Sequence, residues 1–275
     1  MIASQEKISW LKELSDQRRL KSILLLIGAF TFAFLFGELV HEFGHYFCHM
    51  AYGNEGVQVH IDPFGGTHIS GADGLSAVVL GVTSAAGPLL NITLGLIVFL
   101  LLWRLRRPIL LPLLLWGAVA MIQDGVTFSV GLLTHGGDAA LISVLGVPQL
   151  AILIFGITLL IAGIGGVVLL LPLAGIDCND PPRMKLFIIL IGMCSLMLIR
   201  AVHSFVVAPA FVMENLIPLV FALLLAAIIV LVHPTVIRIS SMIGSTQMFI
   251  VTWSASYLAI VMGAAMFTFQ LFNFD

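Results

Sequence analysis

Seven long apolar runs constrain this chain more than any other feature of its sequence. The runs lie at about residues 22–51, 76–103, 108–134, 148–174, 186–208, 215–233 and 246–272. Each is close to the roughly 20 residues that an α-helix needs to cross the hydrocarbon core of a bilayer. We therefore expect an all-α polytopic membrane protein with about seven transmembrane helices, embedded in membrane lipid.

The composition of the chain supports a membrane protein and argues against binding to nucleic acid. Of 275 residues, 60% are hydrophobic and 9% are charged, whereas soluble domains average roughly 45–50% and about 25%. A water-soluble fold of this size has too little interior to remove so much apolar surface from water. The net charge of -2 provides no basic surface for a phosphate backbone.

Basic residues are concentrated in alternate segments between the apolar runs. Residues 1–21 contain five Lys and Arg, 104–107 contain three and 183–185 contain two, whereas 52–75 and 135–147 contain none. The positive-inside rule then places the N-terminus in the cytoplasm and the C-terminus outside. Residues 1–21 form a cytoplasmic N-terminal segment, as a short interfacial helix or as a solvated tail.

A polar segment with a strand pattern follows the first run. Between Gly53 and Asp73, the apolar residues Val57, Val59 and Ile61 alternate with polar ones. This alternation between flanking glycines predicts a short β-hairpin, with a surface loop as the alternative. At membrane depth, such backbone must be covered by protein or water.

The pattern that carries chemistry is His41-Glu42-Phe43-Gly44-His45, inside the first apolar run. The two histidines are four residues apart and lie on one helical face, where both can bind one Zn²⁺. Glu42 lies about 100° round the helix and can reach a water molecule that the metal activates. Because ionisable groups are costly in a membrane span, three within five residues indicate a metal site.

Catalytic zinc generally needs a third protein ligand and an open position. Two carboxylates qualify, Asp124 in the third run and Asp138 just beyond it, and His49 is a weaker candidate. We favour Asp138, since Asp124 lies about 20 Å deeper along a helix that rises 1.5 Å per residue. Asp138 is alternatively a helix N-cap, and Asp124 a buried partner of a ligand histidine.

These motifs resemble those of the site-2 protease family of intramembrane zinc metalloproteases. The resemblance rests on the HExxH pattern inside a span, the strand-like segment after it, and Ala86-Gly87-Pro88-Leu89-Leu90-Asn91 in the second run. It covers residues 22–147, which would form a three-helix catalytic core, whereas residues 148–275 add four helices with no recognised motif. Gly136-Gly137-Asp138-Ala139 departs from the Pro-rich lead and Asp-Gly of the family.

The resemblance implies a zinc endopeptidase that cleaves transmembrane protein or peptide substrates. The predicted topology places its site toward the outer half of the membrane, because the HExxH pattern lies in the outer half of the first span. His41, His45 and Asp138 would bind zinc, with Glu42 as the general base. Asn91 would help to hold the substrate or the active-site helices, and a hydrogen bond between helices explains it equally well. An extended substrate could pair with the edge of the strand at 57–61.

Two other classes of function remain open from the sequence. The first is a metal-binding membrane transporter or an inactive protease homologue. An intact Glu42 argues against inactivation, although a transporter can use such a group as a proton relay. The second is a di-iron desaturase or hydroxylase, for which the chain has eight histidines but no HxxHH box. The substrate and the oligomeric state are not predictable from the sequence.

Overall fold

The computed structural model describes residues 17–64, 67–71, 75–133, 137–207, 212–243 and 249–273. Side chains at 212–215, 239–243 and 272–273 are outside this description. Most of the predicted N-terminal segment, residues 1–16, also lies outside it, so the interfacial helix stays a prediction. The remaining residues of that segment, from Gln17 onward, are the described start of the first long helix.

Helices account for most of the described chain. The elements in order are α2 (Gln17–Ala51), β1 (Gln58–His60), β2 (His68–Ser70), α3 (Ala77–Trp103), a 3₁₀ turn (Pro108–Leu110), α4 (Leu111–Leu133), α5 (Gly137–Ser143), α6 (Gln149–Leu170), a second 3₁₀ turn (Leu171–Ala174), α7 (Pro182–Val206), α8 (Val212–Ile243) and α9 (Trp253–Asn273). Seven of the described helices are long and apolar enough to cross a membrane. This confirms the predicted class, a multi-pass helical membrane protein.

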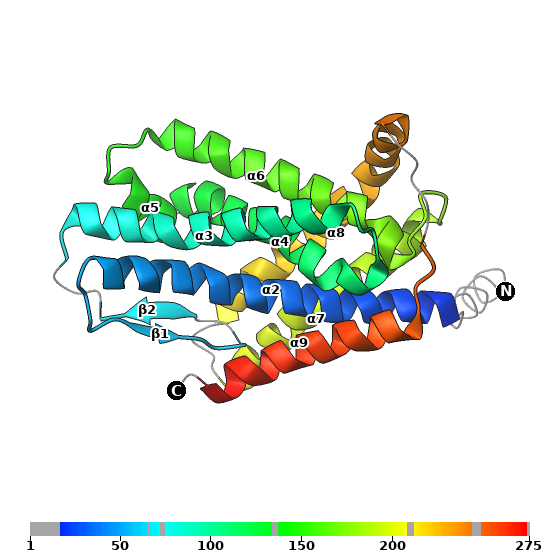
Figure 1. Cartoon of the computed structure of the whole chain (residues 1–275), viewed down its shortest axis with the longest axis horizontal. Coiled ribbons are helices and arrows are strands. Elements are labelled where there is room, and N and C mark those ends of the chain that lie inside the picture. The colour runs from blue at the N-terminus through cyan, green and yellow to red at the C-terminus, as the bar shows by residue number, and fades with distance from the viewer. Residues whose placement is uncertain are drawn as a thin grey trace.

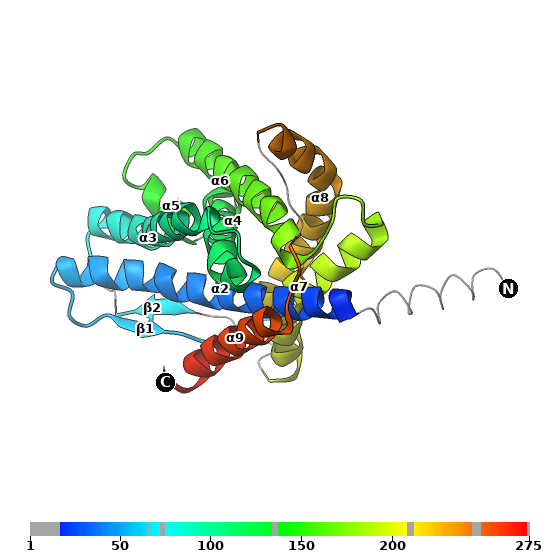
Figure 2. The same ribbon diagram turned by 45° about the vertical axis from the view of Figure 1, so that its right-hand side comes forward.

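The long helix α2 lies at the centre of the bundle and packs against α3, α4, α7 and α9 (Figure 1). Its buried face is almost wholly apolar, with Leu25, Leu26, Ala29 and Phe30 in the main core. Helices α7 and α8 pack against each other along one side, and they reach the rest of the bundle through α2 and α6 (Figure 2). The position of α2 brings its polar residues within reach of several helices.

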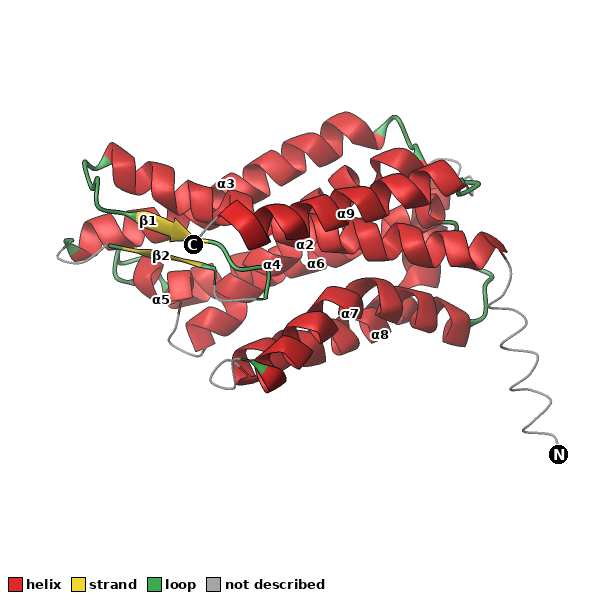
Figure 3. Cartoon of the chain, turned by 90° about the horizontal axis from the view of Figure 1, so that it is seen from below, coloured by secondary structure: helices red, strands yellow, loops and turns green. Residues whose placement is uncertain are grey.

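The predicted hairpin is present and lies beside α2 (Figure 3). Strands β1 and β2 are antiparallel, with Val59 opposite Ile69 and His60 opposite His68. Val57 and Ile61, on the apolar face of the alternating pattern, are buried. Protein therefore covers one face of this short sheet, as its backbone would require near a membrane.

The hairpin and α5 lie at the same end of the bundle, opposite the described start of α2 (Figure 1). The HExxH pattern is in the last third of α2, and Asp138 lies in the first turn of α5. The predicted depth of Asp138 therefore agrees with the arrangement of these elements. The predicted depth of Asp124 is wrong, because α4 packs against α2 so that Oδ1 of Asp124 lies 2.8 Å from Nδ1 of His41. The described ends of the chain lie at opposite ends of the bundle, as an odd number of crossings requires.

Candidate metal centre

His41, His45 and Asp138 form a compact group at this end of the bundle. Their ligand atoms all lie within 4.8 Å of one another, and among the described residues no other such group of three was found. The Oδ2 atom of Asp138 is 3.1 Å from Nε2 of His41 and 3.5 Å from Nε2 of His45. Three potential ligands, one of them from a different helix, thus converge on one point.

The geometry of this group suits a tetrahedral zinc ion. Zinc binds imidazole nitrogen and carboxylate oxygen at about 2.0–2.2 Å, so neighbouring tetrahedral ligands lie about 3.3–3.6 Å apart. The two distances from Asp138 are close to this separation. Two imidazoles and one carboxylate are also a donor set that zinc accepts, with one position left for water or substrate.

Hydrogen bonds fix the orientation of the His45 ring. Its Nδ1 atom is 2.7 Å from the backbone carbonyl oxygen of Thr83 in α3. A carbonyl only accepts, so Nδ1 must carry a proton, and in the neutral imidazole Nε2 then keeps its lone pair. The nitrogen that faces Asp138 is therefore the one available to a metal.

A carboxylate holds the His41 ring at Nδ1, the nitrogen on the opposite side of the ring from Asp138. Its Nδ1 atom is 2.8 Å from Oδ1 of Asp124, which is 1% exposed. Metal-ligating histidines commonly donate their second ring N–H in this way, which sets the tautomer and strengthens the ligand. Asp124 therefore occupies the position of a buried partner of a ligand histidine, the alternative role that the sequence left open for it.

Two more side chains continue this line of hydrogen bonds. Asn91 donates from Nδ2 to Oδ2 of Asp124 at 2.8 Å, and it accepts at Oδ1 from Nε1 of Trp116 at 3.0 Å. Asn91 lies on α3, and both of its partners lie on α4. Asn91 thus holds two helices together behind His41, while a role in substrate binding stays a prediction.

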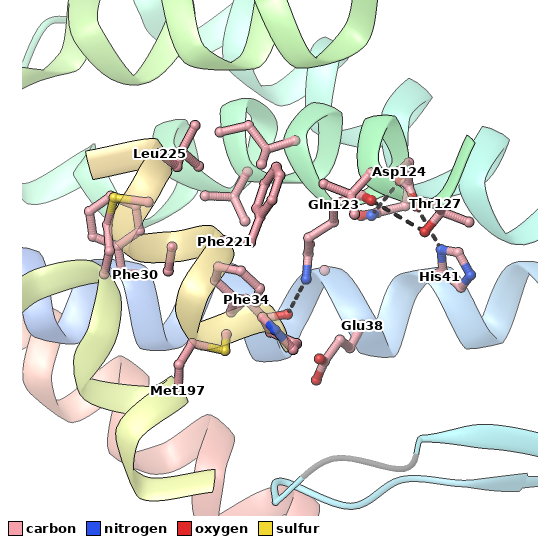
Figure 4. Close-up of a pocket in the computed structure, with 18 of the residues that line it drawn as sticks. Phe30, Phe34, Glu38, His41, Gln123, Asp124, Thr127, Met197, Phe221 and Leu225 are labelled. Carbon is pink, nitrogen blue, oxygen red and sulfur yellow. Dashed lines mark hydrogen bonds and ion pairs between the residues drawn. The ribbon is translucent and has the colours of Figure 1, made fainter. Parts of the chain in front are cut away.

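Glu42 faces a cavity of about 410 Å³ next to the group. The volume lies within the range of small-ligand pockets. Figure 4 shows its apolar part, with Phe30 and Phe34 from α2 and Phe221 and Leu225 from α8. Glu38, His41, Glu42, Asn91, Gln123, Asp124 and Arg200 also line it. A carboxylate beside the candidate ligands thus opens onto a mainly apolar chamber.

The surroundings of Asp138 keep it ionised. Burial disfavours its charged form, but hydrogen bonds and charge interactions with His41 and His45 outweigh burial and hold the pKa of this carboxyl well below its usual range. Metal ligands of this kind must be deprotonated to bind. Asp138 is thus a carboxylate when the histidines beside it are protonated, and the histidines must release their protons for all three groups to bind a metal.

No other described histidine or cysteine belongs to this group. His49, the weaker candidate ligand, is 4% exposed, and its Nδ1 atom has no hydrogen-bond partner. The rings of His60 and His68 stack on each other in the hairpin, and His203 stacks on Phe64. His135, a further polar residue near the third span, lies outside the described residues.

The sequence reasoning missed Thr83 and Trp116. Thr83 acts through its backbone carbonyl, for which residue type gives no signal. Trp116 had a weak signal, since an indole N–H in an apolar span needs an acceptor. Its partner Asn91 lies 25 residues away on another helix, and helix packing alone decides that they meet.

Comparisons with protein-family models, with curated proteins and with solved structures gave no match to this chain.

A glycine allows α3 to approach the histidines closely. A Cβ added at Gly87 would overlap the His45 ring and lie 2.8 Å from the backbone oxygen of His41. The Thr83 carbonyl holds this ring at Nδ1, so a shift of the ring that relieves the overlap would also move Nε2. We expect Gly87→Ala to weaken zinc binding at least tenfold, measured by competition with a chromogenic chelator. Gly165→Ala, at a position with open space around it, is the matched control and should bind zinc as the wild type does.

Proposed function

We propose that the protein is an intramembrane zinc metalloprotease that hydrolyses peptide bonds in or near transmembrane segments of protein substrates. The observation that carries the proposal is the convergence of His41, His45 and Asp138 beside Glu42 within an apolar helical bundle. The proposal agrees with the resemblance of residues 22–147 to the site-2 protease family.

The chemistry would follow from the placement of these side chains. A zinc ion held by His41, His45 and Asp138 would polarise the substrate carbonyl and lower the pKa of a water molecule toward about 7. Glu42 would accept the proton of the attacking water and return it to the leaving amine. Asp124 would keep the Nδ1 proton of His41 in place, and the Thr83 carbonyl would do the same for His45.

The substrate would have to be extended where it is cut. A helix protects its own amides, so a transmembrane segment must unwind locally before hydrolysis. The short sheet beside α2 offers strands with which such a segment could pair by backbone hydrogen bonds. Pro substitutions along residues 57–61 would remove backbone donors, and we expect them to slow cleavage. Unchanged cleavage in these variants would argue against strand pairing.

The orientation in the membrane is part of the proposal. The absence of Lys and Arg from 52–75, where the hairpin lies, favours an external position for this end of the bundle. The metal centre would then lie toward the outer half of the membrane, with the N-terminus in the cytoplasm.

Removal of zinc tests the proposed activity. We expect the purified protein, reconstituted with a panel of helical transmembrane peptides, to release fragments that mass spectrometry identifies. A zinc chelator should stop cleavage, and added Zn²⁺ should restore it. If zinc crosses the liposome membrane and no peptide fragment is released, the result would favour a metal transporter over a protease. Restoration by iron and not by zinc would favour an iron enzyme.

A further inference from the structure

Outside the metal group, the most prominent polar contact in the bundle is an ion pair between α7 and α2. Nη1 and Nη2 of Arg200 donate to the two carboxylate oxygens of Glu38 at 2.7 and 2.6 Å. The Arg200 side chain is 6% exposed. A buried pair of this kind is weak evidence for stability, because desolvation offsets much of the attraction. In a membrane span such residues usually serve a function.

The same guanidinium also holds the hairpin turn. Nε of Arg200 donates to the backbone carbonyl of Pro63 at 2.8 Å. Pro63 lies between β1 and β2, so a single side chain joins α7, α2 and the turn of the hairpin. Arg is suited to this contact because its planar fork presents several fixed donors at once.

A second residue of α7 contacts the next residue of the turn. The ring of His203 stacks on Phe64 with centroids 3.9 Å apart and an angle of 14° between the planes. Arg200 and His203 are three residues apart and therefore share one helical face. Phe267 of α9 meets the same Phe64 ring edge-on at 5.4 Å. Helices α7 and α9, from the half of the chain without a recognised motif, thus contact Pro63 and Phe64 together.

These contacts with the hairpin turn lie close to Glu42, the proposed general base. Glu38 lies four residues before Glu42 on α2. Both line the cavity, together with Thr67, which follows the turn of the hairpin. Figure 4 shows Glu38 directed away from α4, whereas His41 points toward Asp124. The ion pair therefore fixes the far side of α2, and the hairpin turn with it, beside the candidate centre.

We propose that Arg200 is a positioning residue that holds the hairpin turn against α2 next to Glu42. This gives the C-terminal helices a role, since α7 and α9 would support the element that receives the substrate. The role in cleavage rests on the proposed protease function, but the anchoring of the turn does not.

Hydrogen exchange tests the anchoring without any activity assay. We expect amides of residues 58–62 and 67–70 to exchange at least about tenfold faster in Arg200→Met than in the wild type, because a charged hydrogen bond that closes the turn is lost. Lys185→Met is the control, since Lys185 is a buried cation on the same helix that donates to Cys178 instead. It should leave exchange in the hairpin unchanged.

Two more variants separate anchoring from misfolding. Glu38→Gln with Arg200→Met removes both charges of the pair, and Arg200→Lys keeps a cation for Glu38 without the fork that also reaches Pro63. Both should retain bound zinc and helix content, and both should still show faster exchange in the hairpin. Hairpin exchange at the wild-type rate in these folded variants would overturn the proposal.

A kinetic measurement then tests the role in cleavage. For a transmembrane peptide, Arg200→Lys should raise KM several-fold more than it lowers kcat, with zinc content unchanged. A loss of kcat at constant KM would contradict a role in substrate placement. Absence of cleavage in the wild type would instead count against the protease function, while the exchange result would still decide whether Arg200 anchors the turn.

Discussion

Asp138→Asn is expected to abolish stoichiometric zinc binding, whereas Asp124→Asn should weaken it by about 10–100-fold. The Oδ2 atom of Asp138 faces the Nε2 atoms of both histidines, so its loss removes a charged ligand from the centre itself. Asp124 contacts His41 only at Nδ1, the nitrogen that faces away from the centre. Its replacement changes the orientation and basicity of one ligand but leaves all three in place.

Zinc content of the purified variants, measured by inductively coupled plasma mass spectrometry, would separate these roles. Competition titrations would give the affinities, and circular dichroism would establish that both variants keep their helices. Asp177→Asn is the control, because Asp177 lies in the loop before α7 and hydrogen-bonds locally to Asn179. If Asp124→Asn loses zinc and Asp138→Asn keeps it, the ligand set is wrong.

The seven spans and the hairpin follow from local patterns in the sequence. Apolar runs of bilayer length can form little except transmembrane helices, because backbone amides must be satisfied inside the segment. The alternation of Val57, Val59 and Ile61 between glycines is typical of a strand, with a surface loop as its alternative. Both elements are found at the expected places, and most ends agree within about five residues. Helix α8 continues ten residues beyond the predicted end at 233, and α9 begins seven residues after the predicted start at 246.

The candidate ligands were partly predictable for a geometric reason. The spacing of His41 and His45 fixes them on one face, and the position of Asp138 just beyond the third span placed it near them. Depth did not separate the two carboxylates, because Asp124 also reaches His41. The partners of the ligands were not predictable in the same way. Asp124 reaches His41 across 83 residues, and its meeting with Asn91 depends on how α3 packs on α4.

The contacts that anchor the hairpin were even less predictable from the sequence. Glu38 and Arg200 both stand out as charged residues in apolar runs, so each is visible in the sequence. They lie 162 residues apart, and nothing in either span identifies the other as its partner. The contact of Arg200 with the carbonyl of Pro63 involves backbone, for which the sequence carries no signal.

Glu42→Gln has the largest expected effect on activity. The amide keeps the size of the side chain and leaves His41, His45 and Asp138 intact, so zinc should bind as in the wild type. An amide cannot accept the proton of the attacking water, and general base catalysis typically contributes about 10²–10⁴-fold to a rate. Glu55→Gln, at an exposed position in the turn after α2, is the control and should cleave normally.

The most direct test is the cleavage rate of a transmembrane peptide by zinc-loaded Glu42→Gln, with the zinc content measured on the same sample. We expect full zinc occupancy together with a cleavage rate that falls by about 10²–10⁴-fold. Cleavage at the wild-type rate by this zinc-loaded variant would contradict a metalloprotease that uses Glu42 as its base.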